Sequence, residues 1–206
     1  MTAQPPAGQS QWATIIARDP GHSQRYIDRF AMLAAQGADL VGEARLIDAI
    51  VGRGSTILDA GCGPGRHCGY LHRAGHRVVG VDLDPALIAA AEADHPGPTW
   101  LAADLSELDL TVTGIDEPFD VIVSAGNVMT FLDPATRRAV LGRLGAHLAP
   151  EGRVVVGFGA ERGYPFEEFF ADVEAAGLRV AMRLATWDLQ PFEPASDFLV
   201  AILSHP

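Results

Sequence analysis

The chain contains few of the residues that mark a secreted or a membrane-bound protein. Its 206 residues include only 2 cysteines. Cys62 and Cys68 share one short segment, which excludes a disulfide framework and predicts a cytoplasmic location. No apolar run approaches the ~20 residues that span a membrane. The N-terminal stretch lacks the basic region and apolar run of a secretory signal, and we expect a disordered tail over residues 1–10.

Clustered positive charge is missing as well. The 15 basic residues are scattered arginines, the acidic residues number 26, and the formal net charge is −11. A surface with this charge repels polyanions over much of its area. We therefore expect no nucleic acid and no anionic membrane as a partner. The expected partner is a small-molecule substrate, bound by a monomer or a homodimer.

Two classes of ligand are disfavoured by motifs that the chain lacks. Cys62, His67, Cys68 and His72 match no zinc-binding spacing, so we predict that no metal is bound. The Gly-Lys-Ser/Thr ending of a phosphate-binding P-loop is also absent.

A regular alternation of strands and helices is present. Short apolar runs predict buried strands at residues 56–60, 77–81, 99–102, 119–124 and 153–158. Helical patterns predict helices at residues 64–74, 86–93, 135–148 and 166–176. The runs 178–188 and 197–204 have no helix between them and predict a hairpin. These patterns predict an α/β fold: a doubly wound, mostly parallel seven-stranded sheet with an antiparallel C-terminal hairpin and helices on both faces.

The glycine-rich segment ILDAGCGPGRH, residues 57–67, is the most informative stretch of the sequence. Gly61, Gly63 and Gly65 allow a sharp turn and a close ligand, and the turn leads to a helix N-terminus. Arg66 stands where a dinucleotide fingerprint has its third glycine. Taken alone, this pattern is also compatible with a tight turn that binds nothing.

Acidic residues follow three of the predicted strands. Asp59, Asp82 and Asp104 stand at strand carboxyl ends, where open α/β sheets bind their ligands. Asp82 comes about 20 residues after the glycine loop, the place of an acid that accepts from ribose hydroxyls. Asp84 precedes Pro85 and can cap the next helix by itself, which leaves Asp82 for a ligand.

Together these motifs resemble those of the class I S-adenosylmethionine-dependent methyltransferases. ILDAGCGPGRH is similar to the first motif of that family and VVGVDLDP to the second, and the resemblance covers about residues 56–204. It implies a Rossmann-like methyltransferase domain over residues 55–206. We expect residues 11–54 to form a helical cap over it, in which the helix 21–36 acts as a lid. The implied cofactor is S-adenosyl-L-methionine, with S-adenosyl-L-homocysteine as product.

The resemblance also implies individual roles. The loop glycines approach the methionine and ribose, and Asp59 orders the loop and its amine contacts. Asp82 accepts from the ribose hydroxyls beside Leu83, and Asp104 accepts from the adenine amino group beside Leu105. The predicted cofactor-binding residues are Asp59, Gly61, Cys62, Gly63, Gly65, Asp82, Leu83, Asp104, Leu105 and Ala125.

The acceptor side is less constrained by sequence. Methyl transfer needs positioning and exclusion of water, and a general base only when the nucleophile carries a proton. The catalytic residue is therefore unknown, with Tyr26, Asn127 and His22 as candidates. We expect the loops 159–164 and 189–196 to shape an acceptor site. Its candidate apolar walls are Met129, Phe131, Trp187 and Phe192.

The sequence favours methyl transfer to a small molecule, through an oxygen or a nitrogen nucleophile. One alternative is a non-catalytic S-adenosylmethionine-binding sensor or partner protein, because catalysis need leave no mark in the sequence. A nicotinamide-dependent oxidoreductase is disfavoured by Arg66 and by the antiparallel terminal hairpin.

Overall fold

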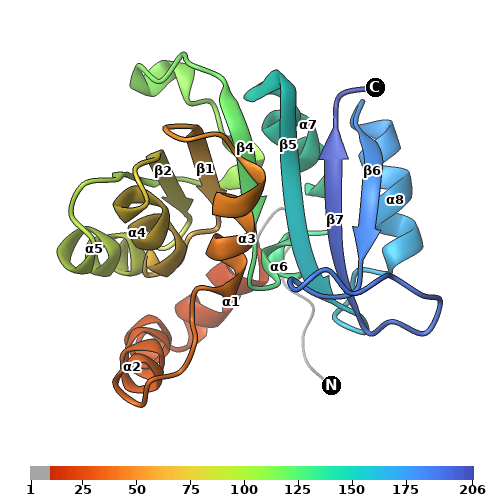
Figure 1. Ribbon diagram of the computed structural model, residues 1–206. Coiled ribbons are helices and arrows are strands. Elements are labelled where there is room, and N and C mark those ends of the chain that lie inside the picture. The colour runs from red at the N-terminus through yellow and green to blue at the C-terminus, as the bar shows by residue number, and fades with distance from the viewer. Residues whose placement is uncertain (1–9) are drawn as a thin grey trace.

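One mixed sheet forms the centre of the molecule. The computed structural model describes residues 10–206, and these form a seven-stranded sheet of order β3-β2-β1-β4-β5-β7-β6 (Figure 1). The strands are β1 (Thr56–Ala60), β2 (Arg77–Asp82), β3 (Thr99–Ala102), β4 (Phe119–Ser124), β5 (Leu148–Gly159), β6 (Arg179–Leu184) and β7 (Phe198–Ser204). The predicted α/β fold is confirmed.

The strand directions bring several loops to one edge of the sheet. β1 pairs in parallel with β2 and β4, β2 with β3, and β4 with β5. β7 is antiparallel to both β5 and β6. The predicted hairpin is therefore present, and its second strand lies inside the sheet while β6 forms the edge. The carboxyl ends of β1, β2 and β4 consequently face the same side of the molecule as the loop between β6 and β7 (Figure 1).

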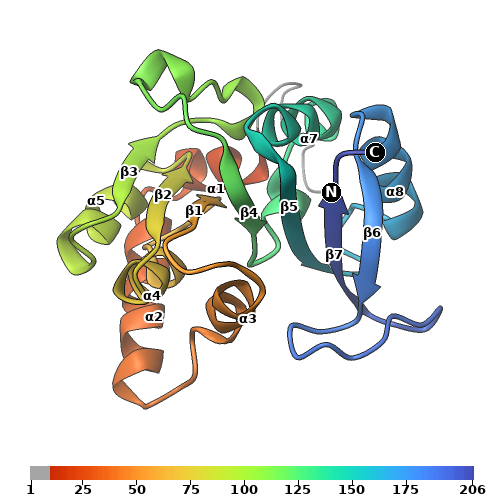
Figure 2. The same cartoon turned by 45° about the horizontal axis from the view of Figure 1, so that its top comes forward.

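Helices cover both faces of the sheet (Figure 2). The helices of the described residues are α1 (Gln11–Arg18), α2 (His22–Ala35), α3 (Gly42–Ile50), α4 (Arg66–Arg73), α5 (Pro85–Asp94), α6 (Val128–Phe131), α7 (Arg137–Ala146) and α8 (Phe166–Ala175), with short 3₁₀ turns η1 (Leu105–Glu107) and η2 (Thr111–Thr113). None of the helices in residues 10–206 is long and apolar enough to cross a membrane.

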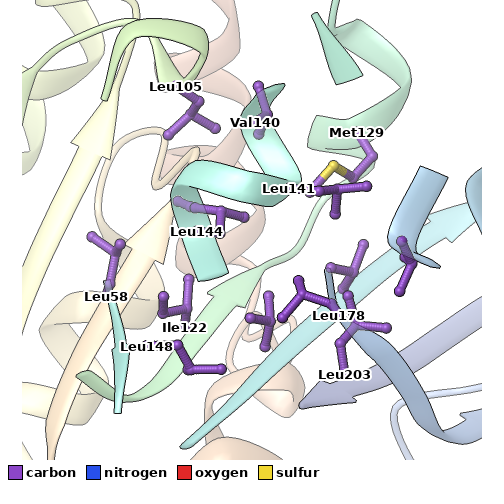
Figure 3. Close-up of a cluster of buried hydrophobic side chains, with 14 of the residues drawn as sticks. Leu58, Leu105, Ile122, Met129, Val140, Leu141, Leu144, Leu148, Leu178 and Leu203 are labelled. Carbon is purple, nitrogen blue, oxygen red and sulfur yellow. The ribbon is translucent and has the colours of Figure 1, made fainter. Parts of the chain in front are cut away.

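Two apolar clusters, one on each face, fix the layers. Leu141 and Leu144 of α7 pack with Leu58 and Ile122 of the sheet in the larger cluster (Figure 3). The opposite cluster combines α3, α4 and α5 with the other face of the same strands. The strands alternate between the two clusters, and both faces are apolar because both are covered by helices.

The element boundaries differ from the sequence prediction mainly around α7. The helix spans Arg137–Ala146, because Asp133 Oδ1 accepts from the amide of Ala135 at 2.8 Å and holds the preceding residues in a turn. β5 begins five residues earlier than predicted, at Leu148, which pairs with Phe119 before a shift in register. The short helix α6 was not predicted.

α1 begins at Gln11, the first residue of the predicted helical cap, and α2 spans His22–Ala35, where a helix was expected over residues 21–36. Ser10 caps α1, and its side chain accepts from the amide of Ala13 at 3.1 Å. The predicted disordered tail otherwise falls on residues 1–9, which lie outside the described residues. α1 and α2 lie beyond the carboxyl edge of the sheet (Figure 1). α3 differs, because Ala44 and Ile47 are buried in the core.

Candidate functional site

The glycine loop after β1 is fastened to the end of β2. The amides of Gly61 and Cys62 both donate to the carbonyl of Val81, at 2.8 and 3.0 Å. Gly61, Gly63 and Gly65 have φ values of 88°, 55° and 81°, in the left-handed region that favours glycine. The loop therefore has a fixed path that other residues would strain.

Close packing also excludes a side chain at Gly61 and at Gly65. A Cβ on Gly61 would lie 2.4 Å from Cγ2 of Val128, and a Cβ on Gly65 would lie 2.5 Å from Cη2 of Trp100. A Cβ on Gly63 would meet only Cε1 of Tyr26, at 3.8 Å. Gly63 thus presents its backbone to open space, whereas Gly65 is pressed against the protein.

That open space is a cavity of about 840 Å³, counted with the solvent at its mouth. Its wall comprises Ser10, Trp12, Tyr26, Gly61, Cys62, Gly63, Pro64, Arg66, His67, Asp82, Leu83, Leu87, Asp104, Leu105, Ala125, Gly126, Val128, Phe131 and Leu132. We call it the first cavity.

Asp82 joins the glycine loop to the end of β2. Its Oδ2 accepts from the amide of Gly63 at 2.9 Å, and its Oδ1 accepts from the amide of Asp84 at 3.0 Å. Burial raises the pKa of Asp82 to about 6, despite these two hydrogen bonds. Each oxygen retains a lone pair, so the carboxylate can also accept from a ligand's hydroxyl groups.

Asp104, after the neighbouring strand β3, can likewise accept hydrogen bonds from the backbone and from a ligand. Its Oδ1 accepts from the amide of Ser106 at 2.8 Å and caps η1. A capping carboxylate has a second oxygen for a ligand donor. Leu83, Leu87 and Leu105 line the same cavity as the two acids. The wall thus combines apolar side chains with two carboxylates.

Asp59 lies behind the glycine loop. Its side chain is only 1% exposed, and it does not line the first cavity. Oδ2 accepts from Cys68 Sγ at 3.4 Å and lies 3.7 Å from Nδ1 of His67. Burial lowers the pKa of His67, but the nearby carboxylates of Asp59 and Glu43 outweigh it, and the net shift is upward. Asp59 and Glu43 thus favour an imidazolium behind the loop.

Arg66 connects the loop to the N-terminal region. Its guanidinium donates to the carbonyl of Leu40 and to Glu43, the latter at 3.3 Å. It also lies over the ring of Phe30, 5.3 Å from the ring centroid. These contacts join α2 and α3 to the start of α4.

A single buried carboxylate holds the N-terminal helices at the cavity. Asp84 is 3% exposed, and its Oδ2 accepts from Nε1 of Trp12 at 3.0 Å and from the hydroxyl of Ser23. Its other oxygen caps α5 through the amide of Ala86 at 2.9 Å. Because Asp84 follows Asp82 by two residues, α1 and α2 are attached beside the ligand-facing acid.

Aromatic rings from α1, α2 and α6 close one end of the first cavity. Trp12 packs edge-to-face against Tyr26 and Phe131, with centroids 5.2 and 5.8 Å apart. His22 packs on the same indole at 5.0 Å but does not line the cavity. Burial raises the pKa of Tyr26, so its phenol stays protonated at neutral pH.

Asn127 lies at the boundary of a second cavity. It adopts a left-handed φ of 68°, and its Oδ1 accepts from the amide of Gly159 at 2.8 Å. The neighbours Gly126 and Val128 line the first cavity, whereas Asn127 lines the second. The second cavity measures about 1040 Å³ with the solvent at its mouth and is lined by Asn127, Gly159, Ala160, Glu161, Arg162, Pro194, Ala195, Ser196, Asp197 and Phe198.

The structure brings most of the predicted site residues to the first cavity. Those that line it are Tyr26, Gly61, Cys62, Gly63, Asp82, Leu83, Asp104, Leu105 and Ala125. Asp59 and Gly65 support the loop from behind, and His22 lies one ring away. Their roles toward a ligand remain predictions.

Sequence reasoning placed the acceptor walls only in part. Phe131 lines the first cavity, but Met129 is in the core, and Trp187 and Phe192 pack against core residues. Trp187 covers Gly157, where a Cβ would lie 2.3 Å from Cζ2 of the indole. Trp12 was missed, and the only signal for it was Ser10 as a possible helix cap.

Comparison with known proteins defines the class. Residues 57–152 match the family model described as a methyltransferase domain. The solved structure of a TehB-like S-adenosylmethionine-dependent methyltransferase from Corynebacterium glutamicum is 48% identical. It has a TM-score of 0.86, and the match covers 91% of this chain and 100% of that one. The chain belongs to the S-adenosylmethionine-dependent methyltransferases, and S-adenosylmethionine is the cofactor of that class.

Two curated relatives have different substrates. A malonyl-acyl-carrier-protein O-methyltransferase from Pectobacterium atrosepticum is 33% identical over 101 residues, which cover 49% of this chain and 38% of the relative. An 18S rRNA (guanine-N(7))-methyltransferase from Mus musculus is 32% identical over 73 residues, which cover 35% and 26% of the two chains. The chain thus matches less than half the length of either relative.

The residues of the first cavity fit S-adenosylmethionine. The two carboxylates, Asp82 and Asp104, suit donors such as ribose hydroxyls and an amino group. The apolar leucine side chains of the same wall suit a flat base. Arg66 and His67 are the only basic residues of this wall, and both already contact Glu43. A cluster of cations for a pyrophosphate is therefore missing from the cavity wall as the structure describes it.

Proposed function

We propose that this chain transfers the methyl group of S-adenosylmethionine to a small-molecule acceptor. The observation that carries the proposal is Asp82, fixed by Gly63 and Asp84 at the wall of the first cavity. In the proposed complex Asp82 accepts hydrogen bonds from the ribose hydroxyls, and Leu83 and Leu105 enclose the adenine. The carboxylate of Asp104 accepts from the adenine amino group. Gly61 and Gly63 lie beside the methionine portion.

When bound, S-adenosylmethionine supplies an electrophilic methyl group on a sulfonium. The chain's own residues position the reactants and exclude water. We assign none of them to proton transfer, because the candidate bases are poorly suited to take a proton. Tyr26 has a raised pKa and is protonated at neutral pH. His22 packs on Trp12 and does not line the first cavity, and the Oδ1 of Asn127 already accepts from Gly159. Catalysis would rest on proximity and enclosure.

Charge and cavity size support a small acceptor over RNA, although some relatives act on rRNA. The net charge of −11 opposes a polyanion. The second cavity, with about 610 Å³ once the open solvent at its mouth is left out, has the size of a small-molecule site and carries Glu161 and Asp197 on its wall. A small neutral or cationic molecule is the acceptor that suits this surface, in a cytoplasmic setting.

The proposal is tested in two stages. Calorimetry should show binding of S-adenosylhomocysteine and none of NAD, and the reverse result would favour a nicotinamide enzyme. Transfer of a labelled methyl group is then measured in parallel on tRNA, rRNA, DNA, a protein extract and a metabolite fraction. Label is expected in the metabolite fraction. Cofactor binding without transfer to any fraction would indicate a sensor, and label only in nucleic acid would refute a small-molecule acceptor.

A further inference from the structure

The second cavity has a different chemistry from the first. Aromatic rings close the first cavity, whereas the charged side chains of the second are Glu161, Arg162 and Asp197. All three are exposed side chains on loops after β5 and before β7. The wall therefore offers one cation and two carboxylates to a ligand, within a space sized for a small molecule.

The loops that carry these charges are fixed to each other. The amide of Ala160 donates to the carbonyl of Asp197 at 2.7 Å. Gly159, the last residue of β5, pairs with Phe198, the first residue of β7. Glu161 has a left-handed φ of 56°, which costs a non-glycine residue about 1–2 kcal/mol. The cavity is thus formed by an ordered turn rather than by two independent loops.

One residue separates the second cavity from the first. Asn127 lines the second cavity, and its neighbours in sequence line the first. Its backbone and side chain are held by the end of β5, through the carbonyl of Gly157 at 3.4 Å and the amide of Gly159 at 2.8 Å. A molecule in the second cavity would therefore lie next to the wall of the cofactor site.

The guanidinium of Arg162 lies close to this boundary. A Cβ on Gly159 would lie 3.0 Å from Nε of Arg162 and 3.6 Å from Oδ1 of Asn127. The absence of a side chain at Gly159 leaves room for the guanidinium beside Asn127. A guanidinium binds a carboxylate through two parallel hydrogen bonds, so a carboxylate held by Arg162 would be placed beside Asn127.

We infer that the second cavity is the acceptor subsite and that it binds a small zwitterion, whose carboxylate pairs with Arg162 and whose ammonium pairs with Glu161 and Asp197. The inference rests on the proposed function. A neutral apolar molecule would displace water from three charged groups without pairing any of them, and a dianion would face two carboxylates. A zwitterion satisfies both signs of charge at once.

The test uses three probes that share a three-carbon skeleton. β-Alanine carries both charges, propionate only the carboxylate, and propylamine only the ammonium. Each is titrated into the ¹⁵N-labelled full chain saturated with S-adenosylhomocysteine, and the amide shifts of residues 126–127, 159–162 and 195–198 are followed. β-Alanine should bind there at least about tenfold more tightly than either single-charge probe, which corresponds to about 1.4 kcal/mol.

Matched variants complete the test. Arg162→Gln should reduce β-alanine binding to the level of propylamine, and S-adenosylhomocysteine should bind as before. Arg153→Gln changes an exposed arginine of β5 outside the cavity wall and should alter neither affinity. Equal binding of the three probes, shifts confined to other residues, or no saturable binding would overturn the inference alone. Failure of S-adenosylhomocysteine itself to bind would refute the proposed function with it.

Discussion

The two cavities at the carboxyl edge of the sheet are built in different ways. The first is walled by backbone turns and buried acids, with glycines pressed against Val128 and Trp100. The second is walled by exposed charged side chains on the loops beside β7. Packing thus fixes the wall that would hold the cofactor, whereas the wall of the second cavity depends on solvent-exposed side chains. Such loops tolerate substitution far better than a packed turn does.

The largest difference is expected from adding one methyl group on each side. Gly61→Ala places a Cβ against Val128 in a left-handed backbone and should destabilise the fold by about 2–5 kcal/mol, with loss of cofactor binding. Gly159→Ala presses only on the flexible Arg162 side chain, since its 3.6 Å approach to Asn127 Oδ1 is an ordinary contact, and should leave S-adenosylhomocysteine binding unchanged. Urea unfolding and calorimetry on both variants make the comparison. Equal losses of stability and affinity in the two variants would show that the two cavity walls are equally rigid.

A smaller effect is expected from removing a carboxylate of the first cavity. Asp82→Ala should weaken S-adenosylhomocysteine binding by about 1.5–3 kcal/mol, the range for hydrogen bonds to a charged acceptor. Asp197→Ala, on the wall of the second cavity, serves as the control and should not change this affinity. If Asp82→Ala remains folded and binds as tightly as the parent, then Asp82 has a structural role only.

The pKa of Asp82 predicts a pH dependence of the same interaction. The pKa is about 6 in the folded chain, so protonation competes with ligand hydroxyls for the carboxylate below that pH. Affinity for S-adenosylhomocysteine should fall about tenfold between pH 7 and pH 5. Calorimetry at several pH values measures the fall, and Asp82→Asn should abolish it. A fall that persists in this variant would point to a different titrating group.

The free energy of unfolding should respond to protonation of Asp82 in the opposite direction from the ligand affinity. Its pKa is raised from 3.8 to about 6, so the folded state binds the proton more tightly than the unfolded state does. This group's unfavourable contribution, about 3 kcal/mol above pH 6, is relieved as the pH falls toward 4. The chain should therefore stay folded at pH 5 while the affinity falls, as circular dichroism on the calorimetry samples can check.

The smallest expected effect concerns the N-terminal cap. If α2 closes over the cofactor, its amides should gain protection from hydrogen exchange when S-adenosylhomocysteine binds. The amides of α8, on the far side of the second cavity, provide the internal control. Protection of residues 61–65 without any change in α2 would refute the lid.

Local patterns were enough to predict much of the first cavity. The glycine spacing, the acids at strand ends and the missing helix before β7 are each properties of a few consecutive residues. Each has a direct structural consequence, a turn, an edge position or a hairpin. Gly61, Gly63, Asp82 and Asp104 could therefore be placed at one edge of the sheet before the structure was known.

The features that were missed depend on residues far apart in the sequence. The burial of His67 requires Glu43 from α3, and the orientation of Gly65 is set by Trp100 from β3. The docking of α1 depends on Asp84, seventy-two positions from Trp12. No local pattern encodes these pairs, and the same reason explains why Asn127 was not linked to the turn after β5.

The tryptophans lie at different parts of the site and can serve as intrinsic fluorescence probes. The chain has 3 tryptophans. Trp12 lies in the N-terminal cap and donates to Asp84, Trp100 covers Gly65 behind the glycine loop, and Trp187 covers Gly157 before the turn that follows β5. Variants that keep a single indole would emit from only one of these places. Fluorescence quenching by acrylamide could then follow the opening of cap, loop and turn separately, in the same solution and without an attached dye.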